Sequence, residues 1–193
     1  DAAHRLRQEM ILGFGAMALA KELGMEKECR VHLNEGHCAM AAVAIYEAEG
    51  SLDACKERCR FTTHTPVAAG HDVFNHDLVR SVTGAALHDR LFEILKIASP
   101  EVTHHKTLSV LNMSWLAASL SGKTNGVSEL NGAIAETLFP DGLIPEGVAF
   151  VTNGVHLATW CVDPKLELLD EFLPGWRSDP ELLEQAELQY IKR

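Results

Sequence analysis

One histidine of this sequence follows a short strand-like run and precedes a turn. Phe61 to Thr63 favour a strand, because aromatic and β-branched residues fit a pleated surface. Pro66 cannot donate to a strand ladder and favours an extended Thr65, so the strand should end near His64. Ligands of open α/β sheets bind at the carboxyl ends of the strands. The sequence therefore predicts that His64 is displayed at a ligand-binding edge.

Three other segments repeat this design, a strand-like stretch that closes on polar residues and a glycine. They are Arg30–His37, with Asn34, Glu35 and His37; Lys123–Ser128, with Asn125; and Phe150–Trp160, with Asn153. Four such strand ends predict a single sheet whose polar ends share one edge.

The order of the elements predicts an α/β fold with a mostly parallel, Rossmann-like sheet and flanking helices. Strands are expected at Val31–Asn34, Arg60–His64, Lys123–Val127 and Val148–Asn153. Helices are expected at Ala2–Leu23, Gly36–Glu49, Ser51–Cys59, Asp77–Gly84, Leu87–Ala98, Thr107–Ser121 and Glu129–Leu138. The tail over residues 164–193 reads as helical, with a break at Pro174 and Gly175. We expect residues 1–193 to form one domain, or one large part of a larger protein.

Composition limits the kinds of partner. An apolar content of 47% argues against disorder, and a net charge of −10 argues against a nucleic-acid footprint. Met10–Ala20 is apolar but too short to span a bilayer, so no membrane partner is expected. The five cysteines are irregularly spaced and include no CxxC pair, which favours free thiols in a reducing, cytoplasmic compartment. The chain starts at Asp1, which we read as a sign of processing or excision.

Metal binding is the weaker reading of the ten histidines and five cysteines. No two histidines have the i, i+4 spacing of an HExxH helix. Cys55 and Cys59 are four residues apart on a predicted helix, but no second pair lies nearby. We therefore expect no metal site.

Five strings occur together over nearly the whole chain. They are HLNEGH (His32–His37), FTTHTPVAAGHD (Phe61–Asp72), LNMSWLA (Leu111–Ala117), NGVSEL (Asn125–Leu130) and VTNGVHLATW (Val151–Trp160). In this order they resemble the α-glucan phosphorylase family, the glycogen and maltodextrin phosphorylases, and above all its short bacterial and archaeal members. The resemblance implies part of the N-terminal domain of a two-domain GT-B glycosyltransferase fold.

The resemblance also implies a reaction. Such enzymes cleave the terminal α-1,4-glucosidic bond of a glucan or maltodextrin with inorganic phosphate and release α-D-glucose 1-phosphate. Their pyridoxal 5′-phosphate is attached to a lysine in the other half of the enzyme. This sequence has no match to that lysine, to the basic phosphate-binding cluster or to the early glycine-rich loop. We therefore expect a separate cofactor-bearing half, no activity of this chain alone, and homodimerisation as a family property.

The site residues are carried over by motif position. His64 matches the histidine whose side chain meets the sugar 6-hydroxyl and whose backbone carbonyl faces the positive charge developing at the anomeric carbon, so it is the expected catalytic residue. Five positions match substrate-binding residues: Asn34, Glu35, His37, Thr65 and Asn153. Asn131 departs from the family, which commonly has histidine there, and we expect that position to be structural.

Simpler roles compete with these assignments. Glu35 lies at a helix start, where the macrodipole favours a carboxylate, so it is also a capping candidate. His37 is equally well explained as an exposed helix residue, and Asn125 and Asn153 as turn residues before glycine. Two other functions stay open for the chain: a glycogen or starch synthase-like glucosyltransferase that uses a nucleotide sugar, and a non-catalytic carbohydrate-binding module.

Overall fold

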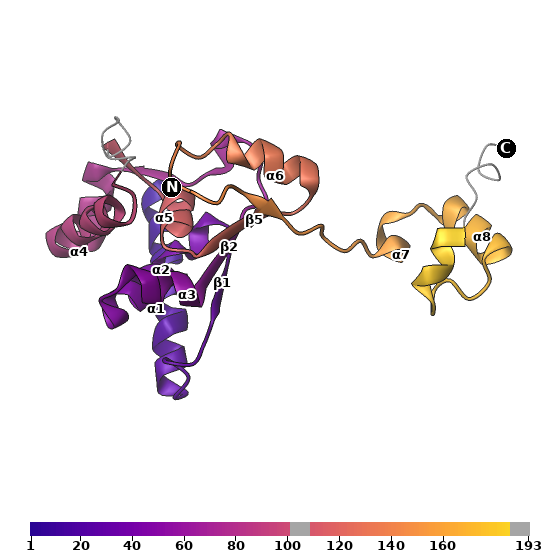
Figure 1. Cartoon of the computed structure of the whole chain (residues 1–193), viewed down its shortest axis with the longest axis horizontal. Coiled ribbons are helices and arrows are strands. Elements are labelled where there is room, and N and C mark those ends of the chain that lie inside the picture. Colours follow the sequence, from indigo (N-terminus) through magenta and orange to yellow (C-terminus); the bar gives the residue numbers. More distant parts are fainter. Residues whose placement is uncertain (101–108, 186–193) are drawn as a thin grey trace. The chain divides into compact units, whose positions relative to one another are not determined.

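The computed structural model describes residues 1–100 and 109–185 and divides the chain into two compact units (Figure 1). The first unit comprises residues 1–152 and contains the sheet. The second begins at Asn153; its described part consists of α7 (Leu157–Trp160), α8 (Asp163–Phe172) and a 3₁₀ segment, η5 (Pro180–Gln185).

Four parallel strands form the central sheet of the first unit, in the order β1-β2-β5-β6. They are β1 (Val31–Asn34), β2 (Cys59–Thr62), β5 (Lys123–Gly126) and β6 (Ala149–Phe150). Leu33 pairs with Phe61, and Phe61 pairs with Thr124. This arrangement confirms the α/β class and the mostly parallel sheet, and it brings the carboxyl ends of the four strands to one edge.

The first unit also contains helices, some of which flank this sheet (Figure 1). They are α1 (Ala2–Glu22), α2 (Ala39–Glu49), α3 (Leu52–Arg58), α4 (His76–Ala98), α5 (Met113–Ser119) and α6 (Glu129–Glu136), with 3₁₀ turns η1 (Gly36–Cys38) and η2 (Ala68–Gly70). Helix α2 contacts β1, α1 and α5, and α6 contacts β5 and β6. The continuous apolar run from Ala39 to Ile45 explains why α2 is buried on most of its surface.

Local end signals set several boundaries as predicted. Gly50 ends α2 in the left-handed region (φ 65°), and the Ser51 hydroxyl accepts a hydrogen bond from Ala54 N–H at the start of α3. Gly24, one residue past the C-cap of α1, also has a positive φ of 71°. The expected break at Gly84 is confirmed, because its φ of 76° and ψ of 168° are non-helical and separate α4 into two helical parts.

The helix predicted at Thr107–Ser121 is wrong over its described first part. Val110–Asn112 is a strand, β4, and it pairs antiparallel with β3 (Val73–Asn75), which the sequence did not predict. The Asn112 side chain then accepts a hydrogen bond from Trp115 N–H, so the helix begins only after it. Positions 107 and 108 of the prediction lie outside the described residues.

Further predicted elements differ in extent, and the second strand covers Cys59–Thr62 instead of Arg60–His64. The fourth strand is limited to Ala149–Phe150, because pairing with β5 stops there. The second unit has its helix α8 where the tail was expected to be helical, and α7 before it was not predicted. Across residues 1–100 and 109–185, none of the helices combines the length and apolarity needed to cross a lipid bilayer.

Candidate functional site

The carboxyl ends of β1, β2 and β5 are joined by backbone hydrogen bonds. Glu35 N–H donates to the Thr62 carbonyl at 2.9 Å, and Thr63 N–H donates to the Asn125 carbonyl at 3.0 Å. The polar residues that follow these three strands therefore share one edge, as the sequence predicted.

The Glu35 carboxylate bridges the first two of these strand ends. Its Oε2 accepts from His64 N–H at 2.7 Å and from Thr65 N–H at 3.2 Å. Its Oε1 accepts from Gly36 N–H at 3.2 Å and from the Thr63 hydroxyl at 3.3 Å. These donors occupy both oxygens, so Glu35 caps the η1 turn and also binds the loop after β2.

The backbone of Glu35 is held in an unusual conformation. Its φ is 72°, and no other non-glycine residue among those described has a positive φ. A side chain in this region costs of the order of 1 kcal/mol or more, which the surrounding contacts must offset. The hydrogen bonds to His64 and Thr65 supply that compensation.

His64 presents its ring at the surface while its backbone is held. The residue is exposed, whereas its N–H donates to Glu35 and its carbonyl accepts from Asn131 Nδ2 at 3.1 Å. The structure thus combines an accessible imidazole with a backbone fixed on two sides. Asn131 was noted in the sequence only as a departure from the family and was not predicted to touch His64.

The other predicted site residues fall on two neighbouring loops and on the second unit. Asn34 is exposed, and His37 and Thr65 are half-buried. Asn34 ends β1 and His37 lies in η1, on either side of Glu35, and Thr65 follows His64. Asn153 is the exposed first residue of the second unit, so its relation to His64 remains a prediction.

A chain of polar side chains ties the strands together just behind these loops. His32 Nε2 lies 2.6 Å from the Thr62 hydroxyl, which donates to Asn125 Oδ1 at 3.0 Å. Because the hydroxyl has one proton and gives it to Asn125, His32 must donate from Nε2. Asn125 Nδ2 in turn donates to the Gly126 carbonyl at 2.9 Å. His32 and Thr62 were missed by the sequence reasoning, although both lie inside predicted strands.

An electrostatic cluster lies at the end of the loop that carries His64. Arg5 Nη2 donates to Asp72 Oδ2 at 2.9 Å, and Arg5 Nε lies 2.9 Å from Glu9 Oε1. Glu9 is only 1% exposed. Burial, followed by the negative charge of Asp72, raises the pKa of Glu9 to about 8, while Arg5 opposes this shift. The cluster fixes α1 to the residue that closes the FTTHTPVAAGHD string.

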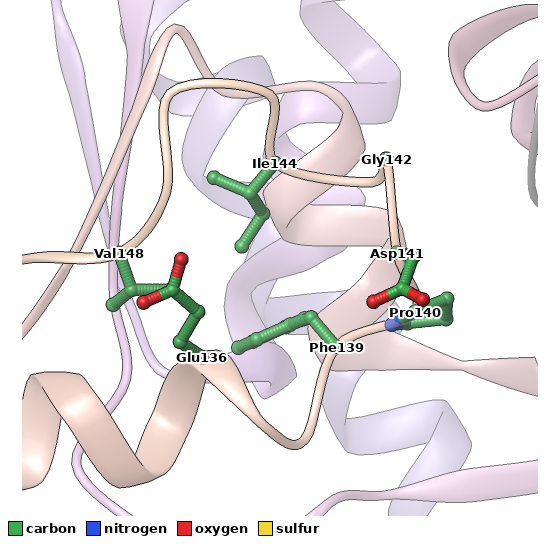
Figure 2. Close-up of a pocket in the computed structure, with 7 residues that line it drawn as sticks. All are labelled: Glu136, Phe139, Pro140, Asp141, Gly142, Ile144 and Val148. Carbon is green, nitrogen blue, oxygen red and sulfur yellow. The ribbon is translucent and has the colours of Figure 1, made fainter.

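Two pockets lie away from these residues. The smaller, of about 110 Å³, follows α6 and is seen in Figure 2 between the side chains of Phe139, Ile144 and Val148. The larger, of about 400 Å³, is lined by Lys56 and by Lys123, the first residue of β5, and so lies at the amino ends of the strands. Neither contains a predicted site residue.

The described residues contain no group of three or more histidine, cysteine, aspartate or glutamate side chains arranged to hold a metal ion. All five cysteines, each within the described ranges, are free thiols, as predicted.

The sequence of this chain was compared with family models and with known proteins. No family model matches the chain. Maltodextrin phosphorylase of Thermococcus litoralis is 33% identical over 196 residues, which cover 92% of this chain and 22% of that protein. Glycogen phosphorylase of Mycobacterium tuberculosis is 28% identical, over 87% of this chain and 22% of its own length. The chain is related in sequence to the α-glucan phosphorylases.

Glycogen phosphorylase of Aquifex aeolicus is a more distant relative, 24% identical over 90% of this chain and 26% of its own length. The relation to α-glucan phosphorylases confirms the resemblance inferred from the five strings. The chain spans about a quarter or less of the length of these curated relatives.

Proposed function

We propose that this chain forms part of the glucosyl-binding wall of an α-1,4-glucan phosphorylase with a two-domain GT-B fold. The carrying observation is that the two strings HLNEGH and FTTHTPVAAGHD, in a chain related to phosphorylases over 92% of its length, are joined at one sheet edge by a 2.7 Å hydrogen bond from His64 N–H to Glu35. The reaction is phosphorolysis of a terminal α-1,4-glucosidic bond to α-D-glucose 1-phosphate.

His64 is the proposed catalytic residue. Its exposed imidazole hydrogen-bonds the 6-hydroxyl of the terminal glucosyl unit, and its carbonyl faces the anomeric carbon. A carbonyl oxygen has two lone pairs, and one of them is taken by Asn131. The second is available to stabilise positive charge as the glucosidic bond breaks, and a fixed dipole does this without reorganisation.

The proposed pocket includes five further positions. Thr65, Asn34 and His37 contact the sugar from the two loops, and Glu35 shapes these loops through its carboxylate. Asn153, the first residue of the second unit, is kept as a predicted substrate-binding position.

Pyridoxal 5′-phosphate, which the family resemblance implies, does not fit the described residues of this site. The cofactor needs a lysine, and the strand-end segments 34–37, 63–66 and 125–128 contain none. Lys56 and Lys123 line a pocket, but that pocket is at the amino ends of the strands. We assign the cofactor and the inorganic phosphate to another part of the protein.

The test is release of glucose 1-phosphate from maltodextrin and inorganic phosphate. We expect activity from the intact protein and none from residues 1–193 alone. Glucosyl transfer from a nucleotide sugar, without phosphorolysis, would instead identify a synthase-like enzyme. Glucan binding by both preparations without either reaction would identify a carbohydrate-binding module. Light scattering of the intact protein checks the expected homodimer.

A further inference from the structure

The side chain of Asn131 is locked at the start of α6. It is 9% exposed, and its Oδ1 accepts from Val127 N–H at 3.0 Å. Its own backbone N–H donates to the Ser128 hydroxyl at 3.1 Å. Because Oδ1 is committed to an N–H donor, the amide can only point Nδ2 toward the His64 carbonyl, 3.1 Å away.

Gly126 packs closely against the Asn131 amide. A Cβ atom added to Gly126 would lie 2.5 Å from Asn131 Oδ1, so only glycine at the end of β5 leaves room for the amide. The position is thus occupied by a buried amide whose hydrogen-bonding groups are paired on both sides.

The bond from Asn131 and a bond to Glu35 hold opposite ends of one peptide group. The His64 carbonyl and the Thr65 N–H belong to the same planar peptide and point in opposite directions. Asn131 Nδ2 donates to the carbonyl, and Glu35 Oε2 accepts from the N–H at 3.2 Å. A rotation of this peptide plane would break both bonds. Glu35 also accepts from His64 N–H, which fixes the preceding peptide.

We propose that Asn131 is a positioning residue which, together with Glu35, clamps the His64–Thr65 peptide and so aims the His64 carbonyl. The clamp itself stands on the hydrogen bonds above. Its consequence for turnover rests on the proposed function, in which that carbonyl faces the reacting carbon. It also defines the role of Glu35: the carboxylate positions the loop backbone through hydrogen bonds, and the loop contacts the sugar.

The first test replaces the donor of Asn131 in the intact protein. Asn131→Asp keeps an oxygen for Val127 N–H and suits the first turn of a helix, but it places an acceptor against the His64 carbonyl. We expect kcat to fall about tenfold, the effect of losing roughly one hydrogen bond, while KM for maltodextrin changes less than about threefold. Asn131→His restores an N–H donor and should recover kcat to within about threefold.

A second readout does not depend on activity. Amide hydrogen exchange over residues 61–66 reports on Thr65 N–H, and we expect it to quicken about tenfold in Asn131→Asp and in Glu35→Gln. The matched control is Asn75→Asp at the N-cap of α4. There the side chain only accepts from Leu78 N–H at 2.8 Å, which aspartate can also do, so kcat and exchange should be unchanged.

The outcomes separate the clamp from the proposed function. If folded Asn131→Asp keeps both the wild-type kcat and the wild-type Thr65 exchange, the clamp is wrong. If the intact wild-type protein performs no phosphorolysis, the proposed function fails, and the exchange rates alone decide the clamp. Should Asn131→Asp not fold, Asn131→Ser takes its place, because its hydroxyl is too short to reach the His64 carbonyl.

Discussion

The buried carboxyl of Glu9 makes stability depend on pH. Its folded-state pKa of about 8 lies above the ordinary value of 4.5, because burial, and then Asp72, disfavour the charged form. Between these two pH values the folded chain binds a proton that the unfolded chain releases. The stabilising contribution is therefore complete below about pH 4.5 and is lost as pH rises through about 8.

Glu9→Gln should remove this dependence. The amide has nearly the shape of the protonated carboxyl, so stability at pH 5 should change little. At pH 9 the variant avoids a buried charge, and its free energy of unfolding should exceed that of the wild type by roughly 1–4 kcal/mol. Urea unfolding between pH 5 and pH 9 measures both. Glu22→Gln, at the exposed end of α1, is the control. Parallel pH profiles of wild type and Glu9→Gln would contradict this account.

His64→Ala separates function from stability at the proposed catalytic residue. The imidazole is exposed, while the groups that fix the loop belong to the His64 backbone. We expect the free energy of unfolding to change by less than about 0.5 kcal/mol. In the intact protein kcat should fall by about 10²-fold, because the variant loses a contact to the reacting sugar. His4→Ala, an exposed histidine on α1, should leave kcat unchanged. Wild-type turnover and affinity in His64→Ala would exclude His64 from the pocket.

The packing of α1 against α2 depends on one glycine. A Cβ added to Gly13 would lie 2.5 Å from Ala41 N and from Met40 Cβ, both on α2. Gly13→Ala should therefore lower the free energy of unfolding by about 1–3 kcal/mol through overpacking. Gly15→Ala is a matched control on the same helix, since nothing lies within 4 Å of its added methyl group. It should raise stability by about 0.5–1 kcal/mol. Thermal unfolding of both variants would reveal the difference in sign, and equal shifts would refute it.

Elements with strong local signals were predictable. The first strand, Val31–Asn34, has the predicted bounds, and Gly50 and Ser51 mark helix ends as expected. The strands β3 and β4 were missed because each has three residues and is stabilised by a partner far along the chain, as with Phe74 opposite Leu111. Their pairing is a tertiary effect that overrides the helix predicted from the sequence at Thr107–Ser121.

The candidate site was predictable where it depends on strand order, but not where it depends on contacts between residues far apart in the sequence. The strand-end rule brought Glu35 and His64 to one edge, because it depends only on strand order and direction. The Asn131 contact was not predictable, since its hydrogen bond spans 67 residues of sequence. A buried asparagine three residues after a helix cap is the one local hint that such a partner exists.

Over residues 1–100 and 109–185, burial is concentrated in the first unit. The hydrophobic core runs from Leu6 on α1 to Leu143 after α6. Within residues 153–185, Trp176 is the one buried residue, and its indole N–H donates to Asp170 at 2.9 Å. The guanidinium of the neighbouring Arg177 lies over the same ring. A single buried aromatic side chain is a small core for a unit of about 40 residues.

The two units should consequently differ in autonomy. Residues 1–152 contain the sheet and the whole hydrophobic core cluster, so on their own they should unfold cooperatively in urea. On heating, their melting temperature should lie within about 5 °C of that of the 193-residue chain. Residues 153–193 alone should show no cooperative transition, because chains of about this length rarely fold without further support. Circular dichroism of both segments and of the full chain is the measurement. A gradual transition with dye-accessible apolar surface in residues 1–152 would mean that the second unit stabilises this core, and the sheet edge carrying His64 would then depend on it as well.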